Sequence, residues 1–192
     1  GDFEQCRNYL EEIKGKVKND PDYVYLSGML LVREQKHQQA LDIFEKALTN
    51  NPHDTRLMNA VGYILTTLNQ DLERAADLLE TAYQKIRKQE PPPLSDLLMV
   101  AHSLGTLYWK QGKLSEAHAL LELAWSQCPP EWVSLRKERR ESLRRFYQET
   151  GKNDELQKLE EMGAVLSSPR NRNDVWHSFS YCHFIFYNRN FL

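Results

Sequence analysis

The chain has 192 residues, of which 41% are hydrophobic and 27% are charged, and its formal net charge is −2. The hydrophobic content excludes a disordered chain, and the missing basic excess argues against a dedicated nucleic-acid binder. Eight Gly and eight Pro argue against collagen and turn-rich β-sandwiches. The three Cys are widely spaced and odd in number, so they make no disulfide framework. No apolar run is long enough for a membrane-spanning helix.

Residues 2–166 carry a helical pattern almost throughout. Apolar residues recur at spacings of three and four, and strand-like alternation is absent there. Short polar residues are expected to cap four helix starts, at Asp20, Asp54, Ser95 and Ser115. Gly112 and Gly151 each follow a helical segment, where a left-handed turn would end the helix.

Small residues recur at fixed distances along the chain. Gly28 and Gly62 are 34 residues apart, and Gly105 follows Gly28 by 77. Two sets of alanines and two prolines recur with them, shifted by one extra residue in the second unit: Ala40, Ala75 and Ala117; Ala47, Ala82 and Ala124; Pro52 and Pro129. Large residues are expected to fill the gaps that the small ones leave, at Phe44, Leu79 and Leu121. The pattern predicts stacked helix hairpins that bury their apolar faces against their neighbours.

The third unit resembles the tetratricopeptide repeat signature, through Leu104-Gly105-x-x-Tyr108, Gly112, Ala117, Leu121, Ala124 and Pro129. The resemblance implies an all-α, right-handed solenoid of antiparallel helix hairpins. We expect the solenoid to span residues 1–166, followed by an irregular aromatic tail at 167–192. Its parts would be a half repeat at 2–18, repeats at 21–54, 55–90 and 98–131, and a degenerate capping hairpin at 132–166.

Motifs that would indicate an enzyme are absent. The glycines all have structural places, and no phosphate-binding loop, nucleophile elbow or zinc-protease motif occurs. His177, Cys182 and His183 form no recognised zinc pattern. We therefore expect no catalysis, no cofactor and no metal.

The first helices of the repeats line the inner surface in this family, and one stripe of them mixes aromatic with neutral hydrogen-bonding residues. Such a stripe suits an extended peptide or a helix of a partner protein. Its members are Tyr25, Met29, Asn59, Tyr63, Thr66, His102, Thr106 and Trp109. The alternative is that Tyr25, Met29 and Trp109 only pack against the neighbouring hairpin. The carboxylate clamp of co-chaperone members is not matched, since Tyr25, Met99 and Ser103 stand where basic residues should.

Two further features leave alternatives open. The basic run from Arg136 to Arg145 is either a solvated face of the last hairpin or a docking patch for an acidic partner or RNA.

The tail has seven aromatics between Trp176 and Leu192. It either docks on the solenoid, occupies the groove, pairs with another chain, or binds a membrane or a missing domain. Self-association or internal docking would use residues 175–192. It is also open that the tail has no evolved role.

The pattern as a whole predicts a scaffold or adaptor that binds a protein or peptide partner, with no nucleic acid and no transmembrane segment. The alternatives are a structural assembly module, or a regulatory domain of a larger protein. The chain shows no signal-peptide pattern and starts inside a helical one, so we expect a piece of a longer protein. A cytoplasmic location is expected, and a periplasmic one stays open if the longer chain is secreted.

Overall fold

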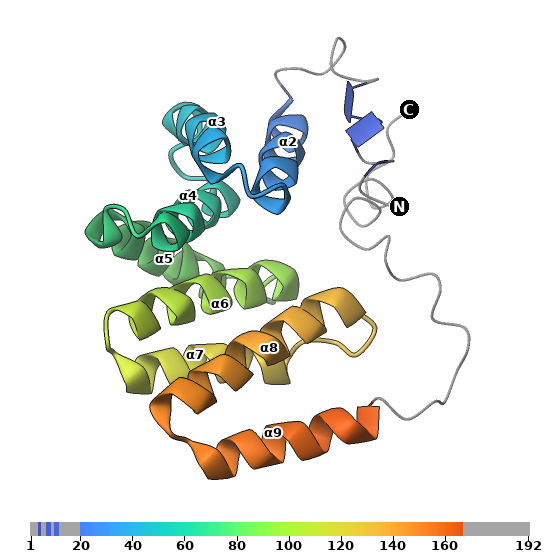
Figure 1. The fold of residues 1–192 in the computed structure, drawn as a ribbon. Helices are drawn as coiled ribbons and strands as arrows, with labels where there is room; N and C mark the ends of the chain where they lie inside the picture. The colour runs from blue at the N-terminus through green and yellow to red at the C-terminus, as the bar shows by residue number, and fades with distance from the viewer. Residues whose placement is uncertain (1–3, 5–6, 9, 12–19, 167–192) are drawn as a thin grey trace.

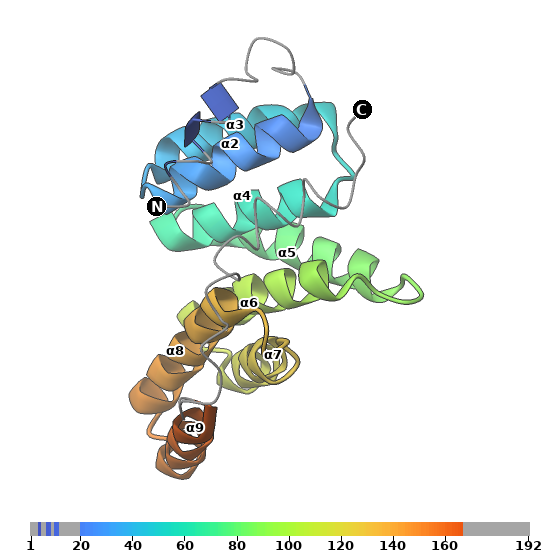
Figure 2. The same cartoon turned by 90° about the vertical axis from the view of Figure 1, so that its right-hand side faces the viewer.

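The computed structural model describes residues 4, 7, 8, 10, 11 and 20–166. Within 20–166 it contains eight helices and no strand. The helices are α2 (Pro21–Arg33), α3 (His37–Asn50), α4 (Thr55–Leu68), α5 (Leu72–Arg87), α6 (Leu94–Lys110), α7 (Leu114–Ser126), α8 (Val133–Thr150) and α9 (Asn153–Leu166). Successive helices pair into hairpins that stack from α2–α3 to α8–α9 (Figures 1 and 2). The aromatic tail and most of the expected half repeat lie outside the described residues.

Local sequence signals explain several helix ends. Asp20 Oδ1 accepts hydrogen bonds from the Asp22 and Tyr23 N–H groups at 2.9 and 3.1 Å. Asp54 caps α4 in the same way. The left-handed turns are also confirmed, since φ is +74° at Gly112 and +70° at Gly151. A side chain at either glycine would strain that backbone.

The two predicted serine caps are wrong. Helix α6 begins one residue before Ser95, after Pro93, and α7 begins one residue before Ser115. The segment before each helix already turns the chain: Pro93 has an extended backbone, and Gly112 makes the left-handed turn that precedes α7. Both serines therefore lie inside the first helical turn.

The glycines allow the two helices of a hairpin to approach closely. A Cβ placed on Gly62 would lie 2.6 Å from Leu79 Cγ, and one on Gly105 would lie 3.0 Å from Leu121 Cγ. Gly28 faces the ring of Phe44 in the same way. The predicted filling of these gaps by large residues is confirmed.

The core has two parts. The larger cluster runs through α2 to α7, and the smaller one joins α7, α8 and α9 around Leu121, Phe146 and Leu159. Helix α9 ends the described stack with exposed polar residues on its outer side, among them Gln157 and Lys158. None of the described helices has the length and apolar character needed to cross a membrane.

Candidate functional site

Side chains connect the first helices of the hairpins into a continuous row, which we call the inner row (α2, α4, α6 and α8). Arg56 Nη1 of α4 donates to Asp22 Oδ1 of α2 at 3.0 Å. Lys110 Nζ of α6 donates to the Thr66 carbonyl of α4 at 2.7 Å. Helices α6 and α8 meet through His102, described below. The predicted stripe therefore lies on helices that are in contact along the stack (Figure 2).

The eight predicted stripe residues differ in exposure. Half are buried: Tyr25, Asn59, Thr66 and His102. The other half are partly exposed: Met29, Tyr63, Thr106 and Trp109. A ligand lying on the inner row would therefore contact mainly these four partly exposed residues.

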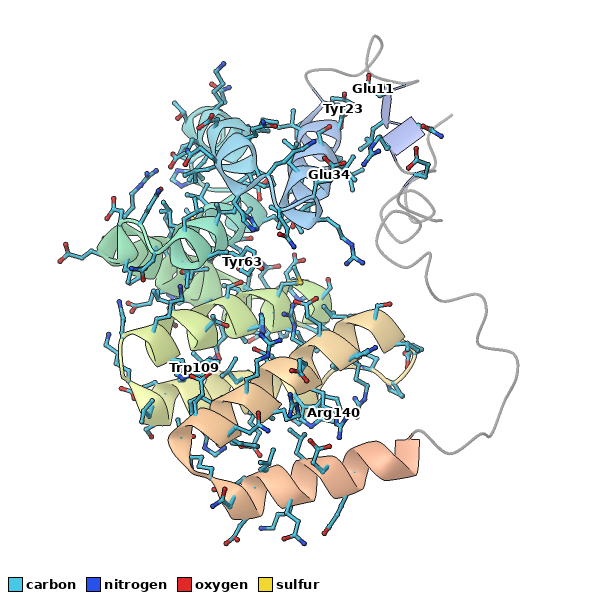
Figure 3. The ribbon with its side chains drawn as sticks, in the orientation of Figure 1. Glu11, Tyr23, Glu34, Tyr63, Trp109 and Arg140 are labelled. Atoms are coloured by element: carbon cyan, nitrogen blue, oxygen red, sulfur yellow. The ribbon has the colours of Figure 1, made fainter. Side chains whose placement is uncertain are left out.

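Two of the aromatic residues pack within the fold. The Tyr25 ring lies 5.8 Å from the ring of Phe44, and the Trp109 ring lies 5.5 Å from that of Phe146 in an edge-to-face arrangement. Such pairs stabilise the stack beyond simple burial. Tyr63 on α4 packs against the core but is partly exposed, and it makes no ring pair with another described aromatic (Figure 3).

His102 belongs to the contact between α6 and α8. Its Nε2 lies 3.0 Å from the Ser142 hydroxyl. Burial lowers the pKa of His102 well below 6.5, and the charge of Arg139 lowers it further. Arg139 is itself buried and contacts Met99 Sδ at 3.1 Å. The imidazole is therefore neutral near pH 7 and acts as a packing residue between the two helices.

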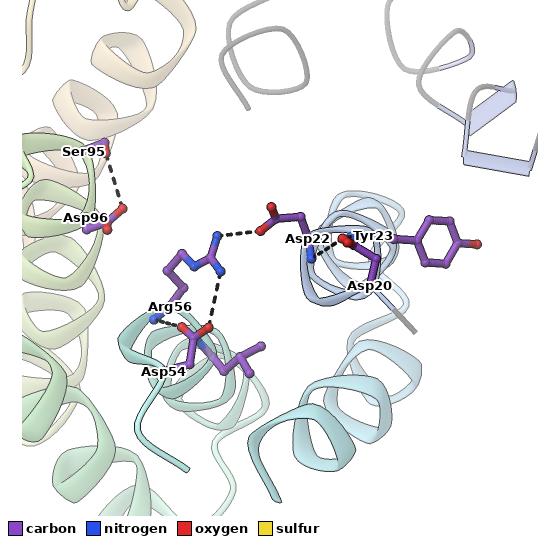
Figure 4. Close-up of polar contacts among 8 residues, drawn as sticks. Asp20, Asp22, Tyr23, Asp54, Arg56, Ser95 and Asp96 are labelled. Atoms are coloured by element: carbon purple, nitrogen blue, oxygen red, sulfur yellow. Dashed lines mark hydrogen bonds and ion pairs between the residues drawn. The ribbon is translucent and has the colours of Figure 1, made fainter. Parts of the chain in front are cut away.

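A charged cluster joins the N-terminal ends of α2, α4 and α6 (Figure 4). Arg56 is held by Asp22 at 3.0 Å and by Asp54 at 3.3 Å, and its guanidinium lies 5.4 Å from the Tyr25 ring centroid. Sequence reasoning missed this cluster. The signal was present, because Asp22 and Arg56 are one repeat length apart and therefore occupy equivalent positions in neighbouring hairpins.

Asp96 completes the cluster from α6. Burial raises the pKa of the Asp96 carboxyl, and a hydrogen bond from Ser95 and the charge of Arg56 offset only part of that rise. The Ser95 hydroxyl donates to Asp96 Oδ1 at 3.3 Å. Within the described residues, Asp96 has no ion-pair partner.

Asn59 lies beside this cluster with an unsatisfied amide. The residue is only 7% exposed, and its Oδ1 has no hydrogen-bond partner. It lines a small cavity of about 10 Å³ together with Tyr25, Arg56, Asp96 and Met99. Buried polar atoms are normally hydrogen-bonded, so a group without a partner marks a place where a ligand or a water could bind.

The basic run on α8 is largely neutralised by neighbouring groups. Four of its arginines pair with glutamates: Arg139 with Glu138, Arg140 with Glu160, and Arg144 and Arg145 with Glu141. Hydrogen bonds from the two arginines lower the pKa of Glu141 to about 2. Arg136 stacks on Trp125 with its guanidinium 4.2 Å from the ring centroid. These contacts favour a structural face over a docking patch.

Comparison with known proteins agrees with this architecture. The sequence model described as "Tetratricopeptide repeat" matches residues 25–91. The fold is similar to a solved thermophilic tetratricopeptide protein, TTC0263 of Thermus thermophilus, with a TM-score of 0.64 and 18% identity over 83% of this chain and 80% of that one. Residues 25–91 therefore carry tetratricopeptide repeats. The fold of the chain is an all-α, right-handed solenoid.

Other solved structures have a similar fold. BtubC of P. vanneervenii has a TM-score of 0.62 and 18% identity, over 89% of this chain and 77% of that one. MamA of Desulfovibrio magneticus RS-1 has a TM-score of 0.53 and 20% identity, over 86% of this chain and 84% of that one. At such identities the likeness establishes the fold alone. No curated protein sequence matches this chain.

The tetratricopeptide fold supports a protein-interaction scaffold, a class of proteins that is typically non-catalytic. Among the described residues, no group of three or more His, Cys, Asp or Glu is placed to hold a metal ion. His177, Cys182 and His183 lie outside the described residues.

Proposed function

We propose that this chain is a non-catalytic adaptor that holds an extended peptide or a helix of a partner protein along α2, α4 and α6 of the inner row. The observation that carries the proposal is on α4, where Asn59, whose Oδ1 has no hydrogen-bond partner, lies one helical turn from the partly exposed Tyr63. An amide both donates and accepts hydrogen bonds, as a peptide group does. The aromatic ring supplies apolar contact area.

Neighbouring positions on α6 extend this surface. Thr106 is partly exposed, and its hydroxyl proton is used on the His102 carbonyl at 2.9 Å. The hydroxyl oxygen therefore remains able to accept a hydrogen bond from a ligand. Trp109 lies one turn further along α6 and keeps part of its ring exposed. A ligand crossing α4 and α6 would meet alternating aromatic and polar groups, as in many peptide interfaces.

A charge placed on this surface should abolish binding without disturbing the fold. The test is a selection of phage-displayed random peptides on the immobilised chain, comparing the native protein with Thr106→Glu. The matched control is Thr81→Glu, which makes the same change at an exposed position on α5. Circular dichroism confirms that each variant is folded.

The native chain and Thr81→Glu should enrich the same peptides, and Thr106→Glu should not. If the native chain enriches no peptides, or if Thr106→Glu enriches them as well as the control does, the proposed surface is wrong. The alternative of an assembly module would use the end hairpins together with the aromatic tail at residues 167–192, which lies outside the described part. Light scattering with and without residues 170–192 would show a change in the number of chains per particle only under that alternative.

A further inference from the structure

We propose that the cavity where α2, α4 and α6 meet receives the ammonium group of a lysine from the bound peptide. The inference rests on the proposed function and specifies the chemistry of its ligand. The cavity has a volume of about 10 Å³ and is lined by Asn59, Asp96, Met99, Tyr25 and Arg56. That volume holds about one water-sized group, and an ammonium group is of this size.

The charge around the cavity favours a cation. Three carboxylates lie at this junction, from Asp22, Asp54 and Asp96, and the guanidinium of Arg56 faces them (Figure 4). A second guanidinium, that of Arg139, contacts Met99 in the cavity lining, so carboxylates still outnumber cations. Arg56 makes its ion pairs with Asp22 and Asp54. Asp96 is partly buried, and its only hydrogen bond in the described structure comes from the Ser95 hydroxyl. A buried carboxylate is stabilised in its charged form by a cation nearby.

The unsatisfied amide supplies an independent reason. Asn59 lines the same cavity, and only 7% of its surface is exposed. No donor forms a hydrogen bond to its Oδ1. An ammonium group has three donors and can serve an amide oxygen and a carboxylate together. A water could satisfy the Asn59 oxygen, but it would not give the Asp96 carboxylate an ion-pair partner, which it lacks among the described residues.

The small size of the cavity favours lysine over arginine. A guanidinium is planar and carries five donors in a fixed fork, so it requires a wider space than an ammonium group does. The flexible methylene stem of a lysine can lie along apolar side chains while its charged end is held. Met99 lines the cavity and is partly exposed, so it offers such surface.

The test uses the same peptide selection with two further variants. Asp96→Asn removes the carboxylate charge, and the control Asp77→Asn makes the same change at an exposed position on α5. The native chain and the control should enrich peptides with a lysine at one fixed position, and Asp96→Asn should not. For one enriched synthetic peptide, replacing that lysine by norleucine, acetyl-lysine or arginine should each raise Kd at least about tenfold.

The peptide-side replacements keep the test valid even if Asp96→Asn disturbs the first turn of α6. The inference is overturned if enriched peptides lack a fixed lysine, or if norleucine or arginine binds as well as lysine does. It is also overturned if folded Asp96→Asn binds the lysine peptide as tightly as the control variant does. In these cases peptides still bind, so the proposed function stands. If the native chain selects no peptides at all, the proposed function itself fails.

Discussion

Substitution of Gly62 by Ala would measure how tightly the hairpin α4–α5 is packed. A Cβ at this position would lie 2.6 Å from Leu79 Cγ and 2.9 Å from Leu79 Cδ2. Leu79 is fully buried, and the nearest atom is the branch point of its side chain, so the helices must shift. Overpacking costs about 1–3 kcal/mol, and the close contact argues for the upper end. Alanine recovers about 1 kcal/mol of helix propensity. The net loss of unfolding free energy should be about 2 kcal/mol.

Urea unfolding followed by circular dichroism would check this value. Gly105→Ala is the matched control, because its Cβ would lie 3.0 Å from Leu121 Cγ, and propensity and crowding should then nearly cancel. Leu79→Ala alone should cost about 2–5 kcal/mol. On that background Gly62→Ala should no longer destabilise, because the new methyl group enters the space that Leu79 leaves. Strictly additive free energies, or equal effects of Gly62→Ala and Gly105→Ala, would refute the reasoning.

Three further predictions concern caps and charges. Asp54→Ala should lower the unfolding free energy by about 1 kcal/mol or more, because it removes the cap of α4. Asp54→Asn should keep most of that stability, since an asparagine oxygen can also accept the backbone N–H bonds. Equal losses for the two variants in urea unfolding would contradict a capping role for Asp54. The carboxyl of Glu141 should titrate by NMR near pH 2, and since its folded pKa is depressed, its stabilising contribution is present above about 4.5 and lost as the pH falls through about 2. High salt should raise that midpoint by screening the arginines; an unmoved midpoint would argue against the ion pairs. His102 has a lowered folded pKa, so stability should fall as the pH drops below 6.5, by up to about 1.4 kcal/mol per pH unit, and His102→Gln should lose this dependence. Identical pH profiles for both proteins would rule out His102 as the cause.

Several features of the chain could be predicted from the sequence because they depend on local or repeated interactions. The caps at Asp20 and Asp54 satisfy N–H groups two and three residues away, and Gly112 supplies the conformation that its own turn needs. The contact of Gly62 with Leu79 is contained within one hairpin. The predicted cap at Ser95 is wrong because the extended backbone of Pro93 already ends the preceding segment, so that α6 begins at Leu94.

The exposure of the candidate site could not be obtained in this way. His102 shares a stripe with Thr106, yet it is buried because α8 brings Ser142 against it from 40 residues further along the chain. That terminal hairpin has lost the repeat spacing, so its position relative to α6 is not encoded in the period.

The sequence by itself determined the helices, the hairpins and the residues that share the inner stripe, because short-range hydrogen bonding and a regular period dictate them. Only the tertiary structure decided that Asn59 is buried with an unsatisfied oxygen and that Asp96 closes a cavity beside it. These properties depend on how closely α2, α4 and α6 approach one another. That distance results from the packing of whole hairpins, which no single residue specifies.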